Sequence, residues 1–149
     1  MKPLLLGCFL LLVTGALAAP PSAVLPPPKT DKLSLGPWED EIGYRQAVRV
    51  GSTLYVSGYV GAGPMAEGLK HAYGTLQKTL AHYGLGFQHV VKENVYTTQI
   101  EELKANGAVR REFYGQDFPA ATWVQVARLF QPDHVVEVEI IAVFPDAKP

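Results

Sequence analysis

Short runs of β-branched and aromatic residues recur along the chain from residue 45 onward and predict five strands. The predicted strands cover residues 45–50, 53–60, 90–98, 122–129 and 135–144. The first two are separated only by Gly51 and Ser52, so they are expected to form a hairpin.

Two amphipathic helices are predicted between these strands, because apolar residues recur there at three- and four-residue steps. The first helix presents Leu69, Ala72, Leu76, Leu80 and Tyr83 on one face and ends at Gly84. The second presents Leu103, Asn106, Val109 and Phe113 and ends at Gly115, although Gly107 is unfavourable inside it.

The predicted order is β-β-α-β-α-β-β, a mixed α/β (α+β) domain with both helices on one face of one sheet. The opposite face of such a sheet has to be covered. Since no further helix is predicted, association of subunits is the expected cover. No internal repeat is present.

The first 18 residues have the three parts of a secretory signal peptide. Lys2 gives the positive charge, residues 4–13 form an apolar stretch too short to span a bilayer, and Ala16 and Ala18 provide small residues before the cleavage point. We therefore predict a signal peptide at 1–18, a proline-rich tether at 19–35 and one domain at 36–146. The mature protein is expected in the periplasm or outside the cell, with no membrane attachment after cleavage.

The tether is expected to be extended and unpaired through residue 32, because proline fixes φ and removes hydrogen-bond donors. Cys8 is the one cysteine of the chain and leaves with the signal peptide. The predicted mature protein therefore has no disulfide and no cysteine-based metal site.

Charge and motifs argue against several classes of function. Without Lys2 the chain has 12 basic and 14 acidic residues, a net charge of −2, so it lacks the positive field that nucleic-acid binding needs. The glycines at 61–63 are not followed by the Lys and Ser/Thr of a phosphate-binding loop, so no cofactor is predicted. No metal is predicted either, because no ligand spacing occurs among His71, His82, His89 and His134.

Six segments, in order and with matching spacing, resemble the Rid (YjgF) family. They are Gly-Tyr-Arg-Gln-Ala-Val at 43–48, Val-Ser-Gly at 56–58, Val-Val-Lys-Glu-Asn-Val-Tyr at 90–96, Asn106, Pro-Ala-Ala-Thr-Trp-Val-Gln-Val-Ala-Arg-Leu at 119–129, and Val-Glu-Val-Glu-Ile-Ile-Ala at 136–142. The resemblance covers roughly residues 36–145.

The resemblance implies a chorismate-mutase-like fold and a homotrimer whose sheets form a central barrel, with small-molecule clefts between subunits. Well-known members of this family hydrolyse reactive 2-enamino and 2-imino acids to 2-oxo acids and ammonia. In those members an arginine of a Pro-Ala-Arg motif, at the start of the penultimate strand, holds the substrate carboxylate. A glutamate of the last strand helps to position the attacking water.

The family's functional positions carry over only in part. Tyr44 matches the cleft tyrosine, Ser57 the serine of the second strand and Asn106 the helix asparagine, while Glu137 matches the glutamate that serves the water. Tyr44 and Glu137 are therefore the candidate catalytic residues. At the arginine position, however, Pro119-Ala120 is followed by Ala121.

The exchange of arginine for Ala121 removes a planar, bidentate, permanently charged partner for a carboxylate. Loss of one partner of a desolvated charge pair weakens binding by about 2–5 kcal/mol. Trp123 is two residues further along the strand and shares the face of Ala121. It is interpreted either as an aromatic wall for an apolar, aromatic or cationic ligand, or as a filler of the space left by the arginine.

Arg110 is the one nearby cation that shares a helix side with a cleft position, since it is four residues after Asn106. Arginine is mostly exposed in proteins, so the sequence favours a solvated Arg110 over one that replaces the missing arginine.

Glu137 and Glu139 share one strand face and are candidates for an acid and base pair. The milder interpretation is favoured, in which one faces the cleft and the other forms a surface or inter-subunit salt bridge. His134 is a weaker candidate base, and a solvated loop histidine is favoured for it.

The sequence therefore predicts an exported homotrimer of the Rid type with weak or no deaminase activity on 2-imino or 2-enamino acids. The alternative is an active imine or enamine hydrolase with a more apolar substrate. Ribonuclease or chaperone activity, claimed for some relatives, fits poorly with the net charge and with export.

Overall fold

The computed structural model describes residues 25–145, and the predicted signal peptide lies outside them. This part of the chain forms a six-stranded sheet with the strand order β1-β2-β3-β6-β4-β5. The strands are β1 (Thr30–Leu33), β2 (Ala47–Val50), β3 (Thr53–Ala62), β4 (Val90–Thr97), β5 (Ala120–Gln125) and β6 (His134–Val143). The helices are α1 (Trp38–Ile42), α2 (Met65–His82), α3 (Ile100–Ala105) and α4 (Gly107–Tyr114), with a short 3-10 turn η1 (Phe87–His89).

Neighbouring strands are antiparallel except for β4 and β5, which are parallel. Parallel neighbours need a crossover connection, and α3 and α4 provide it. In this pair Glu93 lies beside Ala121 and Val95 beside Trp123. Residues side by side in register point to the same face, so Ala121 and Glu93 share a face of the sheet.

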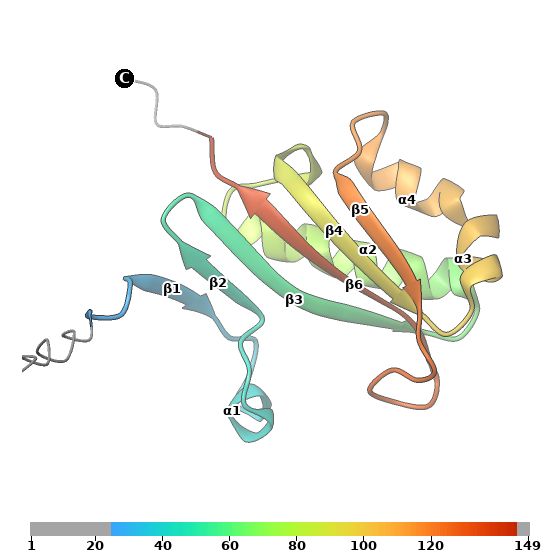
Figure 1. Ribbon diagram of the computed structural model, residues 1–149, viewed down its shortest axis with the longest axis horizontal. Helices are drawn as coiled ribbons and strands as arrows, with labels where there is room; N and C mark the ends of the chain where they lie inside the picture. The colour runs from blue at the N-terminus through green and yellow to red at the C-terminus, as the bar shows by residue number, and fades with distance from the viewer. Residues whose placement is uncertain (1–24, 146–149) are drawn as a thin grey trace, which may run out of the picture.

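α2, α3 and α4 lie on one face of the sheet, as the periodicity predicts (Figure 1). We call this the helix face and the opposite one the open face. The core lies between α2 and the helix face, where alternate residues of β6 are fully or almost fully buried. Its main side chains include Leu54, Leu69, Tyr73, Leu76, Leu80, Val95, Val136, Val138 and Ile140.

The contact between α2 and β3 depends on one pair of glycines. A Cβ atom on Gly61 of β3 would overlap the backbone of Gly68 in α2. Glycine at 61 therefore lets the helix approach the strand closely enough to bury its apolar side. At its other end α2 is followed by Gly84, whose φ of 70° turns the chain away.

The five predicted strands are confirmed, with boundary shifts of a few residues. The prediction that the tether is unpaired through residue 32 is wrong, because Thr30–Leu33 forms β1 and pairs with β2. The last proline of the tether is Pro28, so nothing in the residues that follow prevents strand pairing. α1, a single turn of helix, was also not predicted.

The second predicted helix is two helices, separated at Asn106. The Asn106 side chain donates to the backbone carbonyl of Glu102 at 2.9 Å. Asparagine side chains compete for backbone groups in this way, and Gly107 beside it has a low helix propensity. Among the described residues, no helix has the length and apolar character needed to cross a membrane.

Candidate functional site

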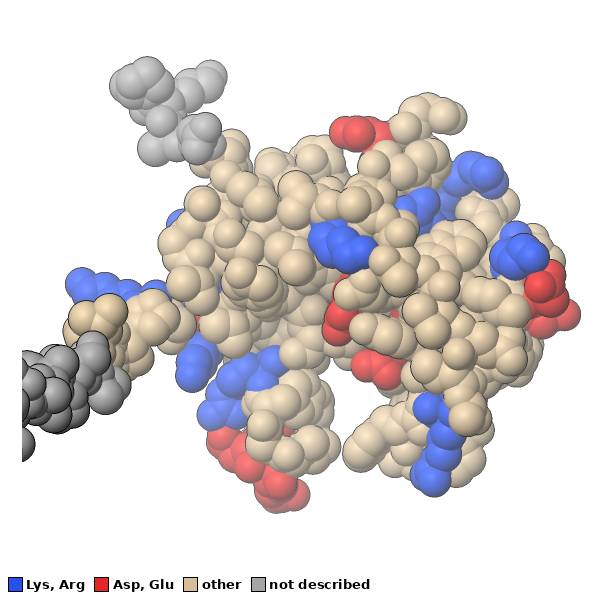
Figure 2. Space-filling view, in the orientation of Figure 1, with Lys and Arg blue, Asp and Glu red and all other residues tan. Residues whose placement is uncertain are grey.

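Three of the predicted site residues line one cavity of about 410 Å³ on the open face. Tyr44, Ser57 and Glu137 reach it from the segment after α1, from β3 and from β6. The other residues that line this open-face cavity are Trp38, Ile42, Gly58, Val60, Phe130 and His134. Figure 2 shows the open face, with a notch between the α1 segment and the loop that precedes β6.

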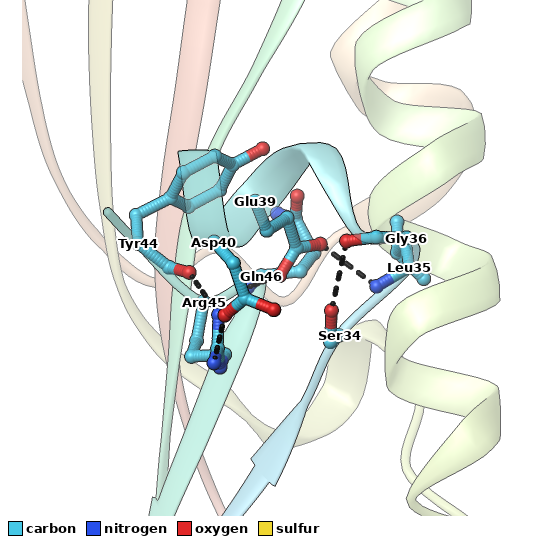
Figure 3. A network of polar contacts seen from close by, with 8 residues as sticks. All are labelled: Ser34, Leu35, Gly36, Glu39, Asp40, Tyr44, Arg45 and Gln46. Carbon is cyan, nitrogen blue, oxygen red and sulfur yellow. Dashed lines mark hydrogen bonds and ion pairs between the residues drawn. The ribbon is translucent and has the colours of Figure 1, made fainter. Parts of the chain in front are cut away.

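The segment that carries Tyr44 is held by the buried carboxylate of Glu39 in α1 (Figure 3). Glu39 accepts hydrogen bonds from the backbone N–H of Leu35 at 2.8 Å and from that of Gln46 at 3.3 Å. These contacts fold residues 35–46 into a loop around one carboxylate. The Tyr44 ring points away from this network and packs against Trp38, with ring centroids 5.6 Å apart.

Ser57 links β3 to the same loop through hydrogen bonds. Its hydroxyl donates to the backbone carbonyl of Arg45 at 2.7 Å, and its own carbonyl accepts from the Gln46 amide at 3.2 Å. Arg45 in turn pairs with Asp40. Because the Ser57 proton is committed to a carbonyl, this serine positions the cavity wall and is not set up as a nucleophile.

Glu137 is the one carboxylate in the lining of the open-face cavity, and it is half-buried. Burial raises the pKa of Glu137, the negative charge of Glu139 raises it further, and His134 opposes the shift. The Glu137 side chain lies directly over Gly58, where a Cβ atom would overlap the carboxylate. A carboxyl with a raised pKa in an aromatic-lined cavity suits proton transfer to or from a weakly polar ligand.

Glu139 is not part of this cavity. It accepts hydrogen bonds from the Asn94 amide at 2.6 Å and from the Tyr96 hydroxyl at 3.2 Å. Within the described residues it makes no ion pair, so the predicted surface salt bridge is not formed inside the chain. His134, favoured as a solvated loop residue, instead begins β6 and lines the open-face cavity beside Glu137.

The remaining predicted site residues do not join this cavity. The side chain of Asn106 donates a hydrogen bond to a backbone carbonyl where α3 meets α4, as described above. Ala121 and Trp123 lie on the helix face, whereas Glu137 lies on the open face. One chain therefore does not bring Ala121 or Trp123 together with Glu137.

The helix face has its own polar cluster, centred on the fully buried Glu93 of β4. Glu93 accepts from the Tyr73 hydroxyl at 2.9 Å, from Nε of Arg110 at 2.8 Å and from the Trp123 indole at 3.3 Å. Burial, and then the negative charge of Glu93, raise the pKa of Tyr73. Since Ala121 is the strand neighbour of Glu93, the place of the family arginine lies beside this carboxylate.

The interpretation of Arg110 as a solvated helix charge is wrong. Its side chain is only 11 % exposed, and its guanidinium lies over the rings of Tyr114, Phe118 and Trp123 at 4.7, 4.8 and 5.7 Å. The reason is Glu93, because a fully buried carboxylate requires a cationic or donor-rich partner. The sequence indicated that Glu93 needs a partner, because Glu93 is two residues before the buried Val95 and so lies on the same, buried face of the strand.

The comparison with protein families matches residues 39–144 to the model described as Endoribonuclease L-PSP. The 2-iminobutanoate/2-iminopropanoate deaminase of Dermatophagoides farinae is 33 % identical over 110 residues, which cover 67 % of this chain and 84 % of that protein. The chain belongs to the Rid/YjgF family. The human 2-iminobutanoate/2-iminopropanoate deaminase is 30 % identical over 109 residues, with 67 % of this chain and 79 % of the human protein covered.

Solved structures of Rid/YjgF proteins have the same fold. A member of the YjgF/YER057c/UK114 family from Mycobacterium tuberculosis matches with a TM-score of 0.72 and 29 % identity, covering 77 % of this chain and 99 % of that one. A YjgF protein from Neisseria meningitidis matches with a TM-score of 0.70 and 24 % identity, covering 80 % and 98 %. The mixed α+β fold expected from the resemblance is thereby confirmed.

Proposed function

We propose that this Rid-family protein is an exported homotrimer that binds a small molecule in clefts between subunits and has weak or no activity on 2-imino and 2-enamino acids. The observation that supports this is the environment of Ala121. Where the family arginine is expected, the chain has a methyl group, and the strand neighbour of that methyl group is the carboxylate of Glu93.

A substrate carboxylate placed beside Ala121 meets no guanidinium from β5. Arg110, the cation bonded to the strand neighbour of Ala121, already gives its Nε to Glu93. Loss of a desolvated charge partner weakens carboxylate binding by about 2–5 kcal/mol, roughly 30-fold to several thousand-fold. The C=N carbon also loses the anchor that would orient it towards water.

The placement of the candidate residues supports the clefts between subunits. Ala121 and Trp123 are on the helix face and Glu137 is on the open face, so a cleft with both kinds of residue needs a second copy of the chain. Sedimentation equilibrium of the purified protein tests this directly. A mass of three chains is expected, and a monomer at all concentrations would contradict the proposed clefts.

The catalytic part of the proposal is tested by hydrolysis of 2-aminoacrylate generated in situ, followed as ammonia release. The wild type is expected to release ammonia at nearly the solvent rate, and Ala121→Arg to raise the rate at least tenfold. Ala120→Arg is the matched control, because its side chain emerges on the opposite face of the same strand and is expected to give no gain. Wild-type turnover equal to that of the deaminase relatives would refute the proposal.

Export is tested by the N-terminus of the mature protein. Mass spectrometry of the protein secreted from its own cells is expected to show Ala19 as the first residue. A mature chain that still carries Met1 and a cytoplasmic location would contradict this part of the proposal. Neither a cofactor nor a nucleic acid is part of the proposed function.

The second candidate function is an imine or enamine hydrolase with a more apolar substrate. The open-face cavity favours it, because Glu137 has a raised pKa there among Trp38, Tyr44 and Phe130, and no Lys or Arg lines the cavity. Hydrolysis of neutral apolar imines, measured as amine release, is the test. Glu137→Gln is expected to abolish the activity and Glu139→Gln to retain most of it, whereas wild-type activity in Glu137→Gln would exclude Glu137 as the base.

A further inference from the structure

A second cavity, of about 290 Å³, lies on the helix face where α3 and α4 meet β5. We call it the helix-face cavity, and the residues that line it are Lys104, Gly107, Arg110, Arg111, Phe118 and Trp123. Three of these side chains are cationic, two are aromatic and none is acidic. The lining is therefore opposite in charge to that of the open-face cavity, which has a carboxylate and no Lys or Arg.

Arg110 is held in this cavity in a fixed orientation. Its Nε donates to Glu93, and three aromatic ring centroids lie 4.7, 4.8 and 5.7 Å from the guanidinium carbon. Nη2 is buried and has no hydrogen-bond partner in the structure. Among the described residues Nη1 also has no hydrogen bond, and it is not one of the buried atoms. The terminal edge of the guanidinium is thus fixed in place with unused donors.

The negative charge of Glu93 does not prevent an anion from binding here. Both of its oxygens accept hydrogen bonds, one from Tyr73 and the other from Arg110 and Trp123. Its side chain is fully buried behind these donors, so a ligand in the cavity does not meet it. Lys104 and Arg111 add positive charge at the cavity mouth, where Lys104 is paired with the exposed Glu101.

We propose that the helix-face cavity binds a flat, apolar monocarboxylate such as an arylacetate, whose carboxylate is held by Arg110 and whose ring packs against Phe118 and Trp123. Planar carboxylates match the fork of a guanidinium, and aromatic rings pack favourably on a tryptophan face. This inference rests on the proposed small-molecule function and names the ligand class and the cation that holds it. Arg110 thus supplies the carboxylate contact from α4 that Ala121 of β5 does not.

The site binds its ligand without hydrolysing it in the same chain. Glu137, the candidate base, is on the other face of the sheet. A carboxylate on Arg110 is therefore separated from that base by the sheet itself. Hydrolysis of a ligand held here therefore requires Glu137 from a second copy of the chain.

Calorimetric titration of the purified protein with phenylacetate and with its neutral counterpart phenylacetamide tests the proposal. Phenylacetate is expected to bind at least tenfold more tightly, because the amide has no charge for Arg110. The indole N–H signal of Trp123 in the ¹⁵N NMR spectrum, assigned with Trp123→Phe, is expected to shift with phenylacetate and to saturate at the calorimetric Kd.

Arg110→Lys is the decisive variant, because a single ammonium keeps a charge near Glu93 but cannot serve Glu93 and a ligand with a planar fork. A loss of affinity of at least tenfold is expected, with the indole signal of Trp123 still dispersed as in the folded protein. Trp123→Leu is expected to weaken binding about fivefold, from lost aromatic packing. Lys78→Gln removes an equal charge from an exposed position of α2, outside the lining of the helix-face cavity, and is expected to change the Kd less than threefold.

Equal binding of the acid and the amide, an unchanged Kd in Arg110→Lys, or no binding of phenylacetate at millimolar concentration would each overturn the assignment. These outcomes are independent of ammonia release from 2-aminoacrylate, which tests the proposed function. If the protein binds phenylacetate through Arg110 and also deaminates 2-aminoacrylate rapidly, the proposed function is refuted but the proposed binding site is not.

Discussion

Glu93 on the helix face and Glu137 on the open face are carboxylates that differ in how their charge is satisfied. On the helix face Glu93 is completely buried and receives three hydrogen bonds, one of them from a cation. On the open face Glu137 is half-buried, and within the described residues its side chain has no hydrogen-bond donor. The pKa of Glu137 is raised as a result of burial and of Glu139.

This difference separates a structural charge from a chemically available one. The three donors to Glu93 are held in place by it and occupy three of the about four acceptor sites of the carboxylate. Glu137 lacks such donors, so its proton equilibrium responds to whatever enters the open-face cavity. The degree of satisfaction of a carboxylate, more than its depth, tells which of the two can exchange a proton.

The largest effect is expected from unpairing the helix-face charge. Arg110→Ala leaves Glu93 buried without a cation and is expected to lower the free energy of unfolding by about 3–5 kcal/mol. Urea denaturation measures it. The matched control is Lys104→Ala, which breaks the exposed pair with Glu101, at 2.9 Å in the structure, and is expected to change stability by less than about 1 kcal/mol.

A double variant sharpens this result. Glu93→Gln combined with Arg110→Met removes both charges and is expected to recover a large part of the stability, because no unpaired ion remains. If the single and double variants lose equal stability, packing of the Arg110 stem on the aromatic rings explains the loss and the ion pair does not.

A smaller effect is expected on the open face from Gly58→Ala. The added Cβ occupies the place of the Glu137 carboxylate, which must move towards solvent. The expected loss of stability is about 1–3 kcal/mol, because the flexible side chain of Glu137 can move aside. The pKa of Glu137 is expected to fall towards its ordinary value, because the carboxyl becomes more exposed to water. Gly74→Ala on α2 is the control, because nothing lies within 4 Å of its added Cβ, and it is expected to stabilise the protein by up to about 1 kcal/mol.

The smallest effect is expected from Glu139→Gln, which removes a charge and keeps the hydrogen-bond acceptor for Asn94 and Tyr96. The pKa of Glu137 is expected to fall, because the second cause of its rise is the charge of Glu139. NMR titration of the Glu137 carboxyl carbon measures the shift. An unchanged midpoint would contradict a Coulombic contribution from Glu139.

The same titration has a consequence for stability with a definite sign. A raised pKa in the folded state means that the folded chain binds this proton more tightly than the unfolded chain does. The wild type is therefore expected to lose stability as the pH rises from the unfolded value of about 4.3 through the raised pKa of Glu137. Urea denaturation across this range is expected to show a smaller loss in Glu139→Gln and none from this group in Glu137→Gln.

The sequence predicted those parts of the fold in which one periodicity is uninterrupted. α2 repeats apolar residues over its length, and β6 alternates buried and half-buried residues from Val136 to Ala142. The prediction joined α3 and α4 into one helix because Asn106 fits the helical period. In the structure its side chain donates a hydrogen bond to a backbone carbonyl, and the helix is interrupted there. β1 was missed because four residues carry too little pattern beside the prolines that precede them.

The candidate site was predictable in its residue types but not in its grouping. Tyr44, Ser57 and Glu137 line one cavity of the chain. Trp38 and Phe130 were missed because a lone aromatic residue in a single helical turn or in a loop carries no periodic signal. Arg110 was misjudged because the general rule that arginine is exposed was applied without asking what neutralises Glu93. The position of the charged Glu93 on the buried face of its strand was the clue that the sequence offered.

The two outermost strands of the described sheet differ in what they offer to another polypeptide. β1 is four residues long and carries the exposed charges of Asp31 and Lys32, which disfavour addition of a further strand. β5 has six residues and no charge, and most of them are exposed. Of the two edges of the described sheet, β5 is therefore the one better suited to extension by backbone pairing with another strand.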